Sequence, residues 1–199
     1  FLQGQITADV EALDVGEKAF GAHCNAKGRI HDNFVIQRQK TDQFLLMLPA
    51  NMAEIAQAAL TKYAVFSKVT IQNLTLSHMA IAASKTSSAL NTEAALKTDQ
   101  GLQDTITADS FVIPYDDTYN VYFLAEKDTD LFAALLTKKN HQWLDSIRWE
   151  QHLQSSGIGF VQPETTGEFI PQMLNMDCID GISFTKGCYT GQETVARMK

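Results

Sequence analysis

The chain has 199 residues, of which 45% are hydrophobic and 20% are charged. These proportions exclude wholesale disorder, a collagen-like repeat and a disulfide-dense miniature, and the length suffices for a hydrophobic core. The formal net charge is −7 and the 16 basic residues are scattered, so bulk electrostatic binding of nucleic acid is not expected, although a local basic pocket is compatible with this composition.

The hydrophobic pattern predicts an α+β protein. In chain order it indicates a helix-like segment over 1–13, strands over 19–24, 30–37 and 43–48, a helix over 51–63 capped by Asn51, and strands over 68–76 and 79–83. The elements predicted after these are a helix near 92–97, strands over 110–113 and 120–125, a helix starting at 129 or 130, and a helix over 143–156 ended by Gly157. Strands followed by helices, twice over, predict two lobes of antiparallel sheet with helices on one face.

The three cysteines, Cys24, Cys178 and Cys188, have no metal-ligand spacing between them. An odd number of cysteines and the lack of a signal-peptide pattern predict reduced thiols and a cytoplasmic protein. Cys178 lies among apolar residues and is expected to be buried. No apolar stretch approaches the roughly 18 residues that a membrane helix needs. Because the sequence starts at Phe1 within a structured pattern, we expect a piece of a longer protein.

The segment 181–193 holds the densest group of chemically capable residues. Thr190 and Glu193 have the spacing of a capping box, which predicts a helix that begins just after Thr190. Cys188 would then precede a helix N-terminus, and Lys186 is two residues away; both features favour a thiolate. Gly191, like Gly187, allows a close approach of the backbone. On these grounds alone, a strand–turn–helix joint with a buried cysteine is the slightly better interpretation.

The same segment carries a family resemblance. Lys186-Gly-Cys-Tyr-Thr-Gly-Gln-Glu193, followed by Val195-Ala-Arg197, resembles the YgfZ signature K-G-C-Y-x-G-Q-E-x-x-A-R. The stretch 169–176 is similar to the family's F-I-P-Q-x-x-N-L segment, and 1–10 to its F-L-Q-G-Q-x-T-x-D-V segment. Segments 24–29 and 63–69 also fit the family pattern. The resemblance therefore covers essentially the whole chain in the right order.

The resemblance implies a fold. YgfZ proteins are similar to the glycine-cleavage T-protein, an aminomethyltransferase that uses tetrahydrofolate. We therefore expect a T-protein-like folate-binding fold of two intertwined ferredoxin-like lobes around a folate channel. One lobe would comprise 1–76 with 141–199, and the other 77–140. The family's C-terminal β-barrel lobe and the first residues of its N-terminal part would be absent from this chain.

The resemblance also implies a function. The family is associated with tRNA modification and with the maintenance of iron–sulfur enzymes, including the radical enzymes that methylthiolate tRNA. We therefore expect an auxiliary folate-binding protein, with tetrahydrofolate or a derivative as cofactor and iron–sulfur enzymes of tRNA modification as partners. Direct tRNA binding is doubtful at a net charge of −7. Two alternatives stay open, a folate-dependent one-carbon transferase and a thiol-bearing scaffold for which folate is incidental.

Site residues transfer where the motif matches. Cys188 is the candidate functional thiol, with Lys186 as its neighbour and Tyr189 as a pocket residue. Trp149 lies 23 residues before Gln172, a spacing at which the family often has an aromatic residue in the folate channel. We predict that Trp149 stacks on folate; Trp143 is the competing candidate, and a plain helix anchor is the alternative role.

The segment 28–34 resembles the G-G-x-x-D-D-L motif of the T-protein. Asp32 is retained, and we assign it and Arg29 to folate binding, together with Gln172. Asn33 replaces the second carboxylate of the motif, and Gln172 stands where the T-protein has a pterin-binding glutamate. Because an amide cannot act as a general base, these two replacements argue against aminomethyl transfer.

Overall fold

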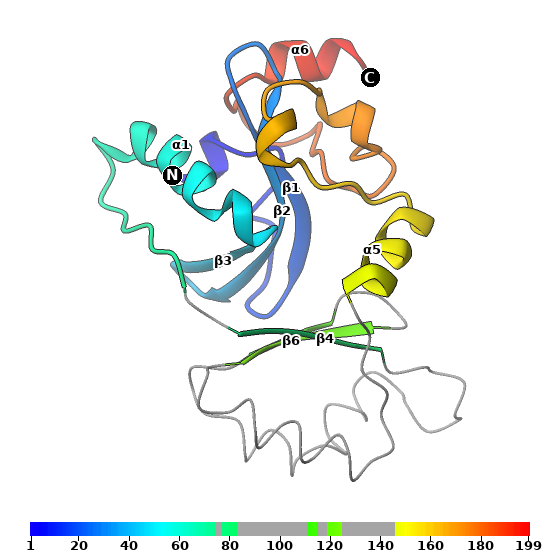
Figure 1. The fold of residues 1–199 in the computed structure, drawn as a ribbon. Coiled ribbons are helices and arrows are strands. Elements are labelled where there is room, and N and C mark those ends of the chain that lie inside the picture. The colour runs from blue at the N-terminus through cyan, green and yellow to red at the C-terminus, as the bar shows by residue number, and fades with distance from the viewer. Residues whose placement is uncertain (75–76, 83–110, 115–118, 125–145) are drawn as a thin grey trace, which may run out of the picture. The chain divides into compact units, whose positions relative to one another are not determined.

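The structure is a computed structural model that describes residues 1–74, 77–82, 111–114, 119–124 and 146–199 (Figure 1). The chain divides into two compact units, Phe1–Asn73 with Leu153–Lys199 and Leu74–His152. The strands are β1 Lys18–Cys24, β2 Ile30–Lys40, β3 Gln43–Met47, β4 Ser77–Ala82, β5 Phe111–Pro114 and β6 Tyr119–Leu124. The α-helices are α1 Ala53–Ala64, α5 Ser146–Ser155 and α6 Gln192–Arg197, and the 3-10 turns are η1 Leu2–Gly4, η2 Ala50–Met52, η4 Pro163–Thr165 and η5 Pro171–Leu174.

The first unit is built on an antiparallel sheet in the order β1-β2-β3. Its central strand β2 is buried from Asp32 to Gln37 without interruption, which is the pattern of a strand covered on both faces. Phe34 pairs with Gly21 and Asn33 pairs with Ala22, so Phe34 and Ala22 point to opposite faces of the sheet. The two faces therefore need separate cores.

Each face of this sheet packs against a different part of the chain. Phe34 and Ile36 pack with the N-terminal segment in a cluster that includes Ile6, Ala8, Val10 and Leu13. Ala22 and Cys24 belong to the second cluster, whose other buried members are Ile30, Met52, Val161, Met176, Ile182 and Val195. The first and last segments of the sequence are thus held on one sheet, and this arrangement positions the segment 181–197.

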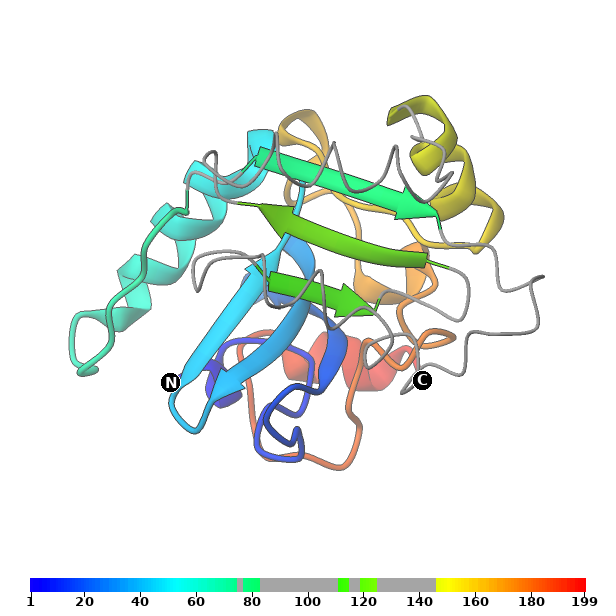
Figure 2. The ribbon, with the colours of Figure 1, turned by 90° about the horizontal axis from the view of Figure 1, so that it is seen from below.

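The second unit contains an antiparallel sheet in the order β4-β6-β5 (Figure 2). Tyr122 of β6 pairs with Met79 on one side and with Val112 on the other. The antiparallel strands of both units confirm the predicted α+β class. The helices predicted at 92–97 and from 129 or 130, as well as Trp143, lie outside the described residues. Within those residues, no helix is long and apolar enough to cross a membrane.

Most predicted strands and helices are confirmed within a few residues, and Gly157 ends α5 with φ 72° as expected. Three local predictions are wrong. The segment 1–13 contains only the 3-10 turn η1, because Ile6 pairs with His23 and the segment then packs against the sheet. Asn51 lies within η2, and Met52 occupies the N-cap of α1. Residues 68–74 form no strand.

Candidate functional site

The segment 181–191 has no regular secondary structure and is fixed by hydrogen bonds to the N-terminal segment. The amide of Ser183 donates to the carbonyl of Thr7 at 2.9 Å, and the amide of Thr190 donates to the carbonyl of Gly4 at 3.2 Å. The Thr7 hydroxyl donates to the carbonyl of Gly181 at 2.5 Å. The two ends of the segment are therefore tied to residues more than 170 positions away in the sequence.

Lys186 supplies the strongest part of this link. Its side chain is buried, and Nζ donates to the carbonyl oxygens of Ile6 at 3.0 Å and Ala8 at 2.6 Å. The ammonium also lies 5.3 Å from the centre of the Tyr189 ring. Burial lowers the pKa of Lys186 to about 8, and the negative charge of Asp9 acts in the opposite direction. The Lys186 side chain thus donates to two backbone carbonyls. The predicted effect of this lysine on the Cys188 thiol stays a prediction.

Two glycines bring the β1–β2 turn against the start of α6. Gly191 is the N-cap of α6, with φ 84°, and Gly28 has φ 73° in the turn. A Cβ atom on Gly191 would collide with the carbonyl oxygen of Asn25 and would lie 2.9 Å from the Cα of Gly28. The predicted helix start is confirmed, but the predicted cap is wrong: no side chain caps α6, and Thr190 Oγ1 lies 3.4 Å from Gln5 Oε1.

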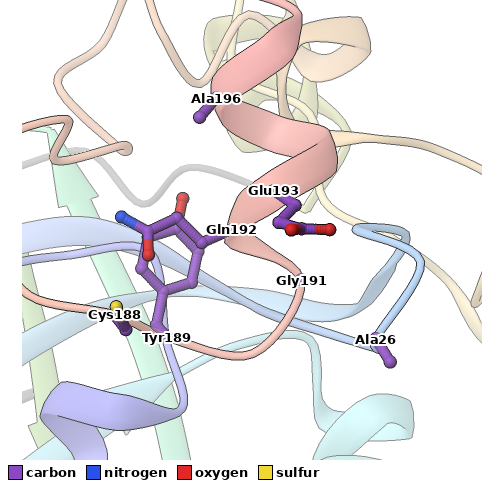
Figure 3. Close-up of a pocket in the computed structure, with 7 residues that line it drawn as sticks. All are labelled: Ala26, Cys188, Tyr189, Gly191, Gln192, Glu193 and Ala196. Atoms are coloured by element: carbon purple, nitrogen blue, oxygen red, sulfur yellow. The ribbon is translucent and has the colours of Figure 1, made fainter.

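A cavity of about 420 Å³ opens beside this joint (Figure 3). Its lining residues are Ala26, Cys188, Tyr189, Gly191, Gln192, Glu193 and Ala196. Cys188 is exposed and free, so the alternative of a buried cysteine in this segment is wrong. In the view of Figure 3, Cys188, Tyr189 and the Gln192 side chain lie on one side of the start of α6, and Glu193 lies on the other. The lining of the cavity therefore includes an exposed thiol together with amide, carboxylate and phenol groups.

A second group of polar residues lies inside the sheet. Asp32 and His23 face each other across β2 and β1, are fully buried, and approach to 3.5 Å between Oδ2 and Nδ1. Neither the two carboxylate oxygens nor the two ring nitrogens have a hydrogen-bond partner. The His31 ring lies 5.3 Å from the His23 ring, and Tyr63 meets His23 edge-on at 5.9 Å. A buried carboxylate without a donor is costly, which marks this pair as a place where a donor is needed.

The sequence alone does not indicate a role for His23. Its pairing with Asp32 depends on the register of β1 against β2, which includes a shift between His23 and Cys24. Because of this irregularity, the positions of the two strands in the sequence do not show which residues pair. Asn33 is explained by its contacts: its amide donates to the carbonyl of Gly159 at 2.7 Å and accepts from the amide of Val161 at 2.8 Å.

The other predicted site residues lie in different places. Gln172 donates through Nε2 to the carbonyl of Val195 at 2.7 Å, while its Oε1 is buried without a partner. Arg29 is exposed, and its guanidinium donates to the carbonyl of Glu168. Trp149 belongs to α5. Cys188 and Tyr189 therefore line one cavity, and Lys186 is buried and does not line it. Asp32 is buried in the body of the unit, and Gln172 is half-buried with a buried Oε1. Among the described residues, no group of three or more His, Cys, Asp or Glu side chains could hold a metal ion.

Cys24 gives a test of the buried part of the site. The Cys24 side chain is fully buried. This burial, together with the negative charge of Asp32, raises the pKa of the thiol from 9.0 to about 12. Between those values the unfolded chain loses a proton that the folded chain keeps, so this contribution to stability is complete below pH 9 and is lost as the pH rises towards 12. We expect the stability difference between wild type and Cys24→Ala to shrink by about 1 kcal/mol per pH unit above 9.

Urea unfolding at pH 8, 9, 10 and 11 measures this difference. Cys178→Ala is the matched control, because Cys178 is exposed, in contrast to the prediction from its apolar neighbours. The control is expected to follow wild type at every pH. A constant difference between wild type and Cys24→Ala across the series would show that the buried thiol does not resist ionisation in the folded state.

Comparison with known proteins identifies relatives of this chain. No protein-family model matches the chain. Proteins called "tRNA-modifying protein YgfZ" match all of the chain: 38% of residues are identical in Photobacterium profundum, 33% in Colwellia psychrerythraea and 35% in Klebsiella pneumoniae. The chain spans about three fifths of these relatives, 60%, 61% and 61% of their lengths respectively.

Among solved structures, the glycine cleavage system aminomethyltransferase T from Bartonella henselae matches with a TM-score of 0.52. The match covers 72% of this chain and 41% of the aminomethyltransferase, with 19% identity, so it shows the fold. The predicted T-protein fold, with antiparallel sheets and helices, is thereby confirmed. The family recognised from the sequence is confirmed as well: along its entire length, this chain is a relative of the YgfZ proteins.

Proposed function

We propose that this chain carries a folate site in an auxiliary protein that supports tRNA modification by iron–sulfur enzymes. Relatives with the name of tRNA-modifying proteins match all 199 residues, which supports the tRNA-modification part of the proposal. The T-protein fold supports the folate part. The chain spans about 60% of the length of its relatives. The partners and substrates of the whole protein are therefore part of this proposal.

The observation that carries the folate proposal is the set of buried acceptors without donors. Both oxygens of Asp32 and Oε1 of Gln172 lack hydrogen-bond partners. A reduced pterin offers amino and ring N–H donors along one edge, and buried acceptors of this kind are stabilised by such donors. The donor groups of the pterin match the chemistry of these acceptors, of which Asp32 Oδ2 also lies 3.5 Å from His23 Nδ1. Asp32 and Gln172 would hold the pterin, and bound tetrahydrofolate would supply a carrier for one-carbon units.

The remaining candidate residues, two of them in the segment 186–193, have different roles in this proposal. Cys188 is the functional thiol, because it is exposed and lines the cavity beside Tyr189. Lys186 is a positioning residue, since its ammonium binds the carbonyls of Ile6 and Ala8 and thereby fixes the segment that carries Cys188. Trp149 and Arg29 stay candidate folate contacts, for stacking on the rings and for binding the carboxylate tail.

Aminomethyl transfer is the less favoured function. Asn33 replaces the second carboxylate of the T-protein pattern, and its amide is occupied by backbone groups at positions 159 and 161. A neutral amide with both ends engaged offers no base for proton transfer. The chain therefore retains acceptors suited to binding folate but lacks a carboxylate at this position for the transfer reaction.

Calorimetric titration of the purified protein with tetrahydrofolate tests the folate proposal. We expect binding that weakens on the order of tenfold or more in Asp32→Asn and in Gln172→Leu, because each loses an acceptor for the pterin edge. Asp42→Asn is the control for charge, since Asp42 is an exposed residue of the β2–β3 hairpin. Thermal unfolding of each variant separates lost binding from lost folding. Absence of binding, or binding that neither substitution changes, would contradict the proposal.

A further inference from the structure

The end of α1 exposes an aromatic and apolar surface. We call Lys62, Tyr63, Val65, Phe66 and Lys68 the α1 tip. Phe66 has an exposed fraction of 101%, Val65 of 72% and Tyr63 of 44%. Burial of an aromatic ring or a branched apolar side chain away from water lowers the free energy of the system. Three such exposed side chains within four residues therefore indicate a contact outside the unit.

The geometry of the tip holds Phe66 away from the core. The amide of Ser67 donates to the carbonyl of Ala64 at 2.8 Å, which closes a turn directly after α1. Gln57 Nε2 donates to the carbonyl of Ile71 at 3.0 Å, so the chain is tied back to the helix after the turn. Figure 2 shows this segment returning alongside α1. Tyr63 is anchored by its edge contact with the His23 ring, whereas Phe66 lies at the turn itself.

The charge around the tip has the opposite sign to the chain as a whole. Lys62 and Lys68 are exposed on either side of Phe66 in the sequence. From residue 55 to residue 74 the chain has these two lysines and no aspartate or glutamate, although the net charge of the protein is −7. The tip therefore combines an open aromatic ring with two cations, in a stretch that is free of carboxylates.

We propose that the α1 tip binds single-stranded RNA. An aromatic ring that is open to solvent stacks on an unpaired base, and lysines beside it contact the flanking phosphates; this is the usual chemistry of single-strand recognition. A purely apolar partner would not need the two cations, and a duplex would offer no unstacked base to the ring. The proposal goes beyond the proposed function, which requires no direct contact with RNA, and it does not depend on folate binding.

Fluorescence anisotropy of the purified protein with a labelled 12-nucleotide oligouridine, at several salt concentrations, tests this inference. Phe66→Ala is expected to lower the affinity on the order of tenfold or more through loss of one stacked base, and Phe66→Trp is expected to retain it. Lys62→Ala and Lys68→Ala are each expected to reduce the slope of log affinity against log salt by about 0.7. Lys40→Ala and Met173→Ala, which alter an exposed lysine and an exposed apolar residue elsewhere, are expected to change neither quantity.

Two results would overturn the inference. One is an affinity for the oligouridine that is the same in wild type and Phe66→Ala, including the case in which neither protein binds it. The other is a change in oligomeric state on Phe66→Ala, measured by sedimentation velocity, without a change in RNA affinity; this result would assign the tip to contact with protein. Neither result bears on the tetrahydrofolate titration, so failure of this inference and failure of the folate proposal are distinguishable.

Discussion

Gly191→Ala is expected to lower the free energy of unfolding by about 3 kcal/mol or more. Two costs add at this position. A non-glycine residue at φ 84° is strained by about 1–2 kcal/mol. The new Cβ would also overlap the carbonyl of Asn25 and crowd Gly28, and separating them costs about 1–3 kcal/mol. Because these atoms join the β1–β2 turn to α6, the variant is also expected to displace the wall of the Cys188 cavity.

Gly167→Ala is the matched control for Gly191→Ala. Gly167 has φ 79°, but no atom lies within 4 Å of the position where its Cβ would be. This control therefore contains the backbone strain without the collision, and it is expected to cost about 1–2 kcal/mol. Urea unfolding of both variants measures the difference. Equal costs would show that the close approach of the turn to α6 contributes nothing to stability.

Lys186→Met is expected to lower the free energy of unfolding by about 2–4 kcal/mol. Methionine keeps most of the buried volume but leaves the carbonyl oxygens of Ile6 and Ala8 without the donor that they share. The segment 186–193 would lose the two hydrogen bonds from Lys186 to the N-terminal segment. The rate at which Cys188 reacts with a thiol reagent is therefore expected to change as well. Lys27→Met, at an exposed position, is the control for removal of a lysine charge.

The pH dependence of Lys186→Met separates this mechanism from a loss of packing. The pKa of Lys186 is lowered to about 8 in the folded chain from 10.5. Between these values the unfolded chain binds more protons than the folded chain, so this residue makes wild type more stable as the pH rises from 8 to 10.5. The cost of Lys186→Met should therefore grow over that range. A cost that is constant with pH would show that the ammonium is not desolvated in the fold.

The sequence predicted what depends on local pattern. The hydrophobic pattern predicted strands over 19–24 and 30–37, which are β1 and β2, and the segment 186–193 indicated where α6 begins. The N-terminal segment was misinterpreted because its apolar residues at 2, 6, 10 and 13 suit a helix, while its actual partner, His23 of β1, is supplied by tertiary contact. Propensity within a short segment cannot outweigh such a contact.

The same distinction applies to the candidate site. The motif predicted a functional thiol at Cys188 and a lysine two residues before it. It could not show that the Lys186 ammonium turns towards Ile6 and Ala8, because those carbonyls come from a segment 178 to 180 residues away. The pairing of Asp32 with His23 was hidden for a similar reason, since it depends on a register shift within β1. Contacts between distant segments thus decide what each motif residue touches.

The most direct test of the central proposal is the methylthiolation level of tRNA, measured by mass spectrometry in cells whose only copy of the intact protein carries Cys188→Ala. The expected result is a loss of the methylthio modification, with normal levels in cells carrying Cys178→Ala, in which the other exposed cysteine is removed. Immunoblotting confirms equal amounts of the two proteins. Normal methylthiolation in the Cys188→Ala cells would contradict the assignment of Cys188 as the functional thiol in tRNA modification.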